Sequence, residues 1–264
     1  MAVKNGSVFV RAYGSLNDFL QPVRRQREFC VHPGLPCPAS HALEAAGIPH
    51  TEVELLLIDG APDLLATTVS DGQRISAFPA GDLPAAGPPL RLPLPDPPVF
   101  ILDVNLGKLA RILRLLGLDA SRPEEMGDEA LAFMSAKQGR ILLTRDRRLL
   151  RRRAVVHGYL VREMDPLRQA AEVMRRFSLQ RWCRPFSLCS RCGGAVRRVP
   201  KREVEDRLEP LTRAHYDEFW LCDGCGRIYW AGSHLPSLTG LLERLGVRTD
   251  TGSGAGLAGR HLAP

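Results

Sequence analysis

The sequence predicts an α/β chain made of three modest units, and three observations lead to that prediction. A proline-rich stretch interrupts the chain at 85–98, short apolar runs alternate with helical patterns between 99 and 180, and two C-x-x-C pairs follow. A chain of 264 residues is longer than most single domains. Its composition, 44% hydrophobic and 25% charged, is globular and excludes a wholly disordered or fibrous protein.

Residues 1–84 are expected to form a small domain with a β-sheet. VFVRAY alternates apolar and polar residues, Ser40 is expected to cap a helix that ends at Gly47, and VELLLI and RISAF predict further strands. This order is typical of a β-grasp unit, and Val53 to Pro79 resembles the ubiquitin-like sulfur carriers. Those carriers act through a free C-terminal Gly-Gly, whereas this chain continues. We therefore expect a docking or scaffolding role rather than sulfur transfer.

The segment 85–98, AAGPPLRLPLPDPP, predicts a linker between domains. Its prolines are incompatible with a helix or a central strand and make the segment semi-rigid and extended. A second boundary is expected near 181–185, where a helical pattern stops, so that 181–249 forms a separate cysteine-containing module. The Gly- and Ala-rich segment 250–264 lacks periodicity, and we expect it to be disordered.

Residues 99–180 are expected to form an α/β domain with a parallel sheet. Three short apolar runs predict strands: Val99–Leu102, Ile141–Thr144 and Gly158–Arg162. Helical patterns lie between and after them: 106–116, 128–138, a basic helix after 146, and a last helix that reaches Phe177. Buried strands that alternate with helices indicate a parallel sheet with helices on its faces.

Each predicted strand of this domain is followed by an aspartate. Asp103, Asp146 and Asp165 hold these positions, and Asp128 begins a helix with Glu129 beside it. Because the carboxyl ends of parallel strands meet at one edge of the sheet, we expect these side chains to converge. Close carboxylates repel one another unless a cation lies among them, and Mg²⁺ or Mn²⁺ prefers such oxygen ligands. The alternative is that the aspartates are helix caps.

Basic side chains are concentrated around these aspartates. The net charge is −3 for 1–98, +6 for 99–180 and +4 for 181–264, so that a polyanion such as RNA or DNA is expected to bind the later part. Two groups of candidates for phosphate contacts are present: Lys108, Arg111 and Arg114 on one helix, and Arg145, Arg147, Arg148, Arg151, Arg152 and Arg153 around Asp146. The alternative is that both groups are solvated helix faces.

Four cysteines in two C-x-x-C pairs predict a metal site. The pairs are separated by 29 residues, each is followed by glycine, and their members are Cys189, Cys192, Cys222 and Cys225. Such turns close a tetrahedral Cys₄ site for structural Zn²⁺, which leaves no open position for catalysis and is typical of a zinc ribbon. Trp220, Tyr229, Trp230 and His234 either pack a small core, as we favour, or stack on nucleic-acid bases.

These stretches together resemble a known family, the PIN-like ribonucleases of the Mut-seven C-terminal type. The likeness covers about 99–235 and rests on FILDVNLGKLARILRLLG, GDEALAF, GRILLTRDRRLLRRR, PFSLCSRCGG and FWLCDGCGRIYWAGSH. The bacterial members are similar to this chain in carrying a ubiquitin-like domain in front. The resemblance implies a metal-dependent RNase site at Asp103, Asp128 and Asp146, with Asp165 as a further residue; it leaves the choice between Asp128 and Glu129 open.

We therefore expect a cytoplasmic ribonuclease that hydrolyses RNA with Mg²⁺ or Mn²⁺ at the carboxylates and Zn²⁺ at the cysteines. No apolar run is long enough for a membrane span or resembles a signal peptide, and no membrane partner is expected. The main alternative is a non-enzymatic zinc-ribbon adaptor that binds RNA. A further alternative is that the front domain docks a protein partner. DNA stays an alternative substrate, because no residue identifiably reads a 2′-hydroxyl.

Overall fold

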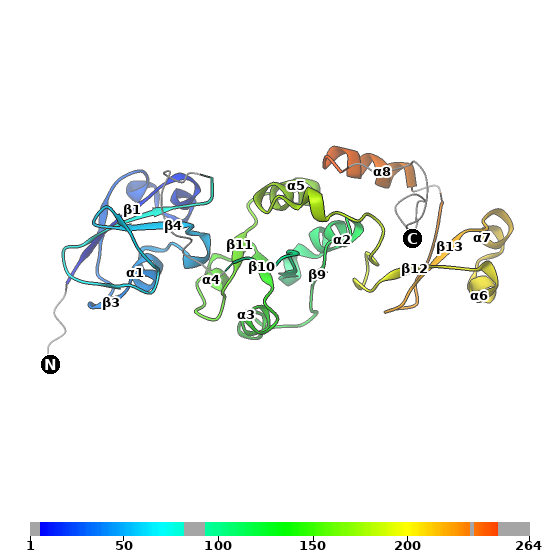
Figure 1. Ribbon diagram of the computed structural model, residues 1–264, viewed down its shortest axis with the longest axis horizontal. Coiled ribbons are helices and arrows are strands. Elements are labelled where there is room, and N and C mark those ends of the chain that lie inside the picture. The colour runs from blue at the N-terminus through cyan, green and yellow to red at the C-terminus, as the bar shows by residue number, and fades with distance from the viewer. Residues whose placement is uncertain (1–5, 82–92, 233–234, 248–264) are drawn as a thin grey trace. The chain divides into compact units, whose positions relative to one another are not determined.

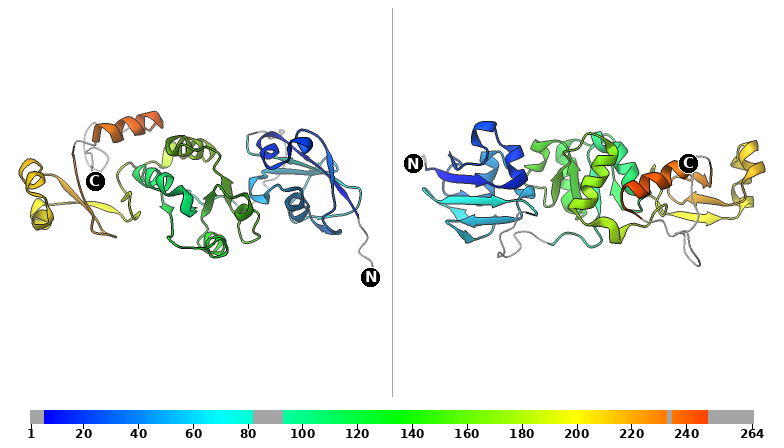
Figure 2. Two further views of the ribbon diagram at one scale, coloured as in Figure 1. Left: turned by 180° about the vertical axis from the view of Figure 1, so that it is seen from behind. Right: turned by 90° about the horizontal axis from the view of Figure 1, so that it is seen from above.

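The computed structural model describes residues 6–81, 93–232 and 235–247 (Figure 1). The chain divides into two compact units, the first made of 1–94 with 127–160 and the second of 95–126 with 161–264. Most of the expected linker, the expected disordered tail and His234 lie outside the described residues. The domain boundaries expected from the sequence stay predictions. Figure 2 shows the elements of each unit from two further sides.

The first unit contains a mixed five-stranded sheet with the strand order β2-β1-β7-β4-β5. The strands are β1 (Val8–Ala12), β2 (Phe29–Val31), β4 (Leu55–Ile58), β5 (Ala61–Pro62) and β7 (Arg74–Phe78), and a separate pair joins β3 (Cys37–Pro38) to β6 (Thr68–Val69). Strands β1 and β7 are parallel, and β4 is antiparallel to β7. The apolar alternation of β1 appears directly in its burial, because Val8, Val10 and Ala12 are buried.

Helix α1 (Ala39–Ala46) starts differently from the expectation. Its N-cap is Pro38, Ser40 lies inside the helix, and no side chain caps the first turn, so the prediction for Ser40 is wrong. The N–H groups of Ala39 and Ser40 donate instead to the carbonyls of Thr67 and Leu65, at 2.8 and 2.9 Å. These backbone acceptors satisfy the free donors that a side-chain cap normally serves. The helix ends as expected at Gly47.

Residues 127–160 supply two parallel strands and two helices to the same unit. The elements are α3 (Asp128–Lys137), β10 (Ile141–Thr144), α4 (Arg147–Leu150) and β11 (Gly158–Leu160). Strands β10 and β11 are parallel, with Leu142 opposite Gly158 and Thr144 opposite Leu160. All four residues of β10 are buried, as a continuous apolar run predicts for a parallel strand.

A short 3₁₀ helix, η3 (His50–Glu52), connects the front sheet region to β11. The N–H of Leu160 donates to Glu52 Oε1 at 2.5 Å, and Glu52 is only 5% exposed. The two ring nitrogens of His50 lie 2.7 Å from Glu44 Oε1 and 2.9 Å from the carbonyl oxygen of Val155. These bonds explain why 127–160 and the front sheet belong to one unit.

Removal of the Glu52 carboxylate is expected to weaken this connection. Glu52→Ala leaves the buried Leu160 N–H without its acceptor, and a hydrogen bond to a charged group contributes about 1.5–3 kcal/mol. We expect faster hydrogen exchange at the Leu160 amide and a lower urea midpoint. Glu52→Gln keeps an acceptor oxygen and should recover most of the protection. Equal exchange rates in the alanine variant and the unaltered protein would contradict this role.

The second unit begins with another strand–helix segment. Its elements are β8 (Phe100–Leu102), η4 (Val104–Leu106), α2 (Gly107–Leu115), β9 (Ala120–Ser121), α5 (Pro166–Arg176) and η5 (Leu179–Trp182). Strands β8 and β9 are parallel, and α2 packs against α5. The predicted strand and both predicted helices occur within one or two residues of their expected bounds. The short strand β9 was not predicted.

The same unit ends in an antiparallel sheet that holds the cysteine pairs. Strands β12 (Val196–Val199), β13 (Phe219–Cys222) and β14 (Ile228–Trp230) pair in that order. The remaining elements are α6 (Lys201–Val204), η6 (Glu205–Arg207), α7 (Pro210–His215) and α8 (Leu235–Arg244). Trp220 and Tyr229 are buried, and Trp230 packs against a core that contains Phe219, which confirms the core interpretation of these aromatic residues. No helix in the described part of the chain is long and apolar enough to cross a membrane.

Candidate metal centres and nucleic-acid surface

The four predicted cysteines are brought together by two tight turns. Cys189 and Cys192 precede β12, Cys222 ends β13 and Cys225 follows it, and their sulfur atoms all lie within 4.8 Å of one another. The Sγ atoms of Cys189 and Cys225 are 3.7 Å apart, and those of Cys192 and Cys222 are 3.4 Å apart. Four soft thiolate donors at this spacing suit a tetrahedral metal ion.

The backbone of each turn supports the sulfur atoms. Gly193 and Gly226, which follow the two cysteine pairs, have φ angles of +83° and +68°, a region that favours glycine. The N–H groups of Gly194 and Gly224 point at Cys192 Sγ and Cys222 Sγ, at 3.4 and 3.3 Å. Backbone donors of this kind stabilise thiolate ligands.

The protein environment shifts the pKa values of the cysteine thiols in opposite directions. Burial raises the pKa of Cys222 to about 12. Burial also opposes the charged form of Cys189, but hydrogen bonds from the Tyr229 hydroxyl, at 3.0 Å, and from nearby backbone N–H groups lower its pKa to about 6. Tyr229 thus supports the cysteine cluster, a role that no spacing of residues in the sequence predicts.

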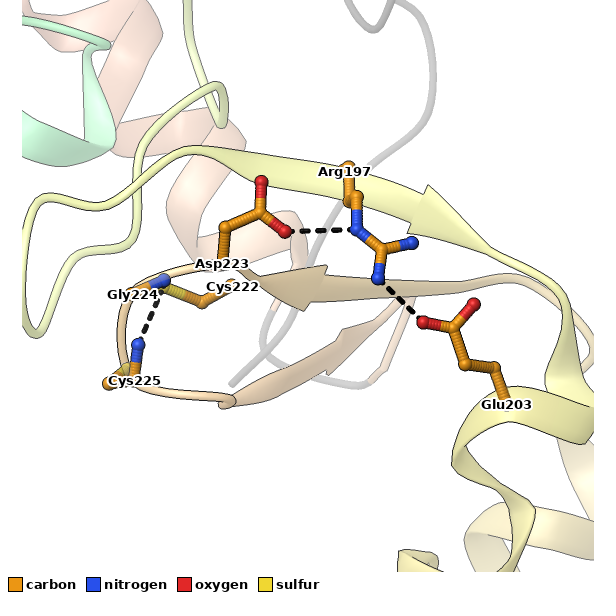
Figure 3. Close-up of polar contacts among 6 residues, drawn as sticks. All are labelled: Arg197, Glu203, Cys222, Asp223, Gly224 and Cys225. Atoms are coloured by element: carbon orange, nitrogen blue, oxygen red, sulfur yellow. Dashed lines mark hydrogen bonds and ion pairs between the residues drawn. The ribbon is translucent and has the colours of Figure 1, made fainter.

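Charged side chains connect the second cysteine turn to β12 and α6 (Figure 3). Arg197 lies between Asp223, at 2.9 Å, and Glu203, at 2.6 Å. Asp223 stands inside the turn between Cys222 and Cys225, and its backbone N–H donates to the carbonyl of Ala195. The two carboxylates raise the pKa of the Arg197 guanidinium, chiefly through the hydrogen bond to Glu203. This ion-paired arginine orients the turn on the sheet.

Arg114 holds the first cysteine turn, and its expected role as an RNA contact is wrong. Its side chain is only 6% exposed, and its guanidinium donates to the carbonyls of Ala120, at 2.7 Å, and Arg191, at 2.6 Å. Burial lowers its pKa. A guanidinium occupied by backbone carbonyls in the protein interior has no access to a phosphate. Lys108 and Arg111 of the same helix are exposed, and their role as RNA contacts stays a prediction.

Three of the four candidate aspartates cap a helix at its N-terminus: Asp103 comes directly after β8, Asp146 two residues after the end of β10, and Asp165 five residues after the end of β11. Asp103 accepts a hydrogen bond from the N–H of Asn105, at 2.8 Å, and Asp146 from that of Arg148, at 2.7 Å. Asp165 accepts from the N–H groups of Leu167 and Arg168, at 3.1 and 3.0 Å. Each is therefore an N-cap. Asp103 is 7% exposed, whereas Asp146 and Asp165 are exposed.

The fourth candidate, Asp128, has a different position. The N-cap of α3 is Gly127, so Asp128 is the first helical residue and Glu129 the second, and both are exposed. Asp128 Oδ2 lies 3.9 Å from a guanidinium nitrogen of Arg152. Negative charge in the first turn also interacts favourably with the helix dipole. The structure does not distinguish Asp128 from Glu129 as a metal ligand, so both residues stay candidates.

The four candidate aspartates are shared between the two units. Asp128 and Asp146 belong to the first unit, and Asp103 and Asp165 belong to the second. Their convergence on one divalent ion is a prediction from the order of strands and helices. All four nevertheless lie at the start of a helix. In an α/β domain, ligands bind outside the carboxyl ends of the parallel strands, where such helices begin.

The arginine cluster of 145–153 is a solvent-facing surface. All of its arginines are exposed: Arg145, Arg147, Arg148, Arg151, Arg152 and Arg153. Arg151 also donates to the backbone carbonyl of Glu44, at 3.4 Å, and Arg147 lies over the Phe19 ring, 5.6 Å from its centroid. The cluster therefore combines anchored arginines with arginines that face water, and its positive charge is of the kind that attracts polyanions.

The fold and these residues define a class of protein in which a small sheet domain is followed along the chain by an α/β domain and a cluster of four cysteines. Comparison with protein families agrees: the Mut7-C RNAse domain matches residues 98–242, and Mut7-C ubiquitin matches residues 6–82. Because the first match covers more than half of the chain, the protein belongs to the Mut7-C RNAse domain family. The resemblance stated from the sequence is confirmed. No curated protein and no solved structure matches the chain.

Proposed function

We propose that this protein is a metal-dependent ribonuclease that hydrolyses RNA phosphodiester bonds. The observation that carries the proposal is the match of the RNAse domain over residues 98–242. The PIN-like architecture of residues 99–180 and the β-grasp architecture of the ubiquitin-like domain are parts of the same proposal. The parallel pairs β8–β9 and β10–β11 support the first, and the sheet around β1 and β7 supports the second.

The carboxylates of Asp103, Asp128, Asp146 and Asp165 would hold Mg²⁺ or Mn²⁺. The chemistry of the donors fits, because these ions prefer oxygen ligands. Use of one carboxylate oxygen as an N-cap acceptor is compatible with metal binding, since each carboxylate has two oxygens. A bound divalent ion supplies a water of lowered pKa and positive charge for the phosphate. The chain itself orients the ligands through the backbone N–H groups of η4, α4 and α5.

The basic residues would bind the RNA backbone near these carboxylates. Exposed Lys108 and Arg111 follow Asp103, and exposed Arg145, Arg147, Arg148 and Arg151 surround or follow Asp146. Guanidinium groups bind phosphate oxygens through charge-assisted hydrogen bonds. DNA would meet the same charges, and the family match favours RNA.

Zn²⁺ is the ion that we propose for the cysteine cluster. Four sulfur ligands occupy all positions of a tetrahedral site, so the ion would be structural. We also propose a cytoplasmic location, because metal-binding thiols suit a reducing compartment. The ubiquitin-like domain is proposed to contact a protein partner through the part of its surface that the 127–160 segment does not use.

A non-enzymatic RNA-binding adaptor is the second candidate, and one observation favours it. Three of the candidate aspartates are N-caps, a structural role that by itself accounts for an aspartate at the start of a helix. The arginine cluster and the cysteine module serve RNA binding equally well without catalysis. The two candidates differ in whether divalent ions are needed for a chemical change in the RNA.

Cleavage of labelled single-stranded RNA in Mn²⁺, Mg²⁺ or EDTA separates them. We expect cleavage with a divalent ion and a loss of at least about 100-fold in Asp103→Asn and in Asp146→Asn, because each removes a charged ligand. Asparagine is an effective N-cap, so both variants should fold. Asp217→Asn, at an exposed ion pair with Lys201, serves as the control and should cleave normally. RNA binding without cleavage in every metal would favour the adaptor.

A further inference from the structure

Helix α3 exposes a large aromatic side chain beside one of the candidate aspartates. Phe133 is 62% exposed, whereas the same helix buries Leu131, Ala132 and Ser135. Phe133 follows Glu129 by four residues and Ala130 by three, which places all three on one face of the helix. A phenylalanine that is this exposed leaves a flat apolar surface available for a ligand.

This face lines an open hollow of about 720 Å³. Its walls are Gly127, Asp128, Glu129, Ala130, Phe133 and Arg152. Arg152 and Asp128 are about half exposed, at 43% and 52%, and their nearest charged atoms are 3.9 Å apart. The hollow is within the range of volumes that hold small ligands and nucleotides. It thus places one aromatic ring and one accessible guanidinium beside a candidate metal ligand.

The charge around the hollow identifies the kind of ligand. Six exposed arginines lie within the nine residues 145–153, and Arg152 is the member that lines the hollow. The lining also carries the carboxylates of Asp128 and Glu129, so an anionic group is expected at Arg152 rather than over the whole hollow. The Phe133 ring adds a surface for a planar group. A planar group joined to a phosphate is the chemistry of a nucleotide, and single-stranded nucleic acid is recognised by aromatic stacking combined with basic contacts to its backbone.

We propose that this hollow is a nucleotide-binding subsite for single-stranded RNA, in which Phe133 stacks on an unpaired base and Arg152 binds the adjoining phosphate. The inference rests on the proposed ribonuclease function for the choice of RNA, and it specifies the substrate of that site. A base inside a duplex is stacked on both of its faces and cannot stack on Phe133 as well. The subsite therefore selects single strands and holds them next to Asp128.

Binding measured without metal tests the subsite independently of cleavage. The probes are a fluorescent single-stranded RNA oligonucleotide and the same strand with abasic residues, titrated with the full-length protein in EDTA. Phe133→Ala should weaken binding of the normal strand by about 5- to 100-fold, the loss expected from one stacked base, and should leave binding of the abasic strand unchanged. Phe133→Trp should retain the affinity, and Arg152→Gln should weaken binding of both strands.

The exposed Leu211, on α7, provides a matched control, because Leu211→Ala removes a comparable apolar surface elsewhere. Its affinity for both strands should equal that of the unaltered protein. The proposal is overturned if Phe133→Ala binds the normal strand as tightly as the unaltered protein, if it weakens both strands equally, or if the unaltered protein binds neither strand. Base-dependent binding without cleavage in Mg²⁺ or Mn²⁺ would support the subsite and reject the nuclease. Cleavage of RNA that Phe133→Ala leaves unchanged would support the nuclease and reject the subsite.

Discussion

Replacement of Cys222 by serine is expected to abolish the proposed zinc binding and unfold the antiparallel sheet of β12, β13 and β14. Cys222 is buried at the end of β13, and its sulfur accepts hydrogen bonds from the backbone N–H groups of Gly224 and Cys225. Structural zinc sites in small modules contribute about 10–16 kcal/mol of apparent binding free energy, which exceeds what so small a core supplies. Zinc content and near-UV circular dichroism measure the loss.

Cys183→Ser is the matched control for this experiment. Cys183 is also buried, but it lies near Met174 and Leu179 rather than in the cysteine cluster, and burial raises its pKa to about 11. The variant should retain one zinc per chain. Retention of zinc and of the folded sheet in Cys222→Ser would show that the cluster does not stabilise the module.

Arg114→Met is expected to destabilise the second unit by about 2–4 kcal/mol. The substitution preserves much of the side-chain volume but leaves the buried carbonyl oxygen of Ala120 and the carbonyl oxygen of Arg191 without their donor. Urea denaturation measures the change in the free energy of unfolding. Arg111→Met, on the exposed side of the same helix, should change it by no more than about 0.5 kcal/mol.

The same pair of variants separates structural from RNA-binding arginines. Arg111→Met should weaken RNA binding, because its guanidinium faces solvent beside the proposed site. Arg114→Met should leave the RNA affinity of the folded protein nearly unchanged at temperatures well below its melting point. Similar stability in the two variants, together with equal losses of RNA affinity, would restore the phosphate-binding role that the structure excludes for Arg114.

The error about Arg114 has a simple geometric origin. Residues three apart on an α-helix are separated by 300° of rotation, so each step of a three-residue pattern shifts the side chain by 60°. Arg114 is therefore rotated by 120° from Lys108 and turns into the protein. Its partners, Ala120 and Arg191, lie in segments whose folding around the helix no local pattern predicts.

Local signals predicted the strands and helices better than the side-chain contacts. Continuous apolar runs located β8 and β10 within a residue, and the two C-x-x-C pairs identified all four members of the cysteine cluster, because each pair acts within a single turn. Tyr229 and Ser40 show the limit: their hydrogen-bonding roles depend on distant segments, the cysteine cluster for Tyr229 and the 65–67 loop for Ser40. The aspartates were predicted near strand ends with helix capping as the alternative role, and the backbone geometry shows that three of them are N-caps.

The contact between Glu52 and Leu160 also bears on how the protein avoids self-association. Strand β11 lies at one edge of its sheet. Unpaired N–H groups at such an edge can pair with strands of other molecules. The buried carboxylate of Glu52 occupies the Leu160 donor, and η3 packs along the strand. The ubiquitin-like domain thus covers part of a strand edge in the Mut7-C RNAse domain that could otherwise pair with another molecule, and this effect is independent of any partner it binds.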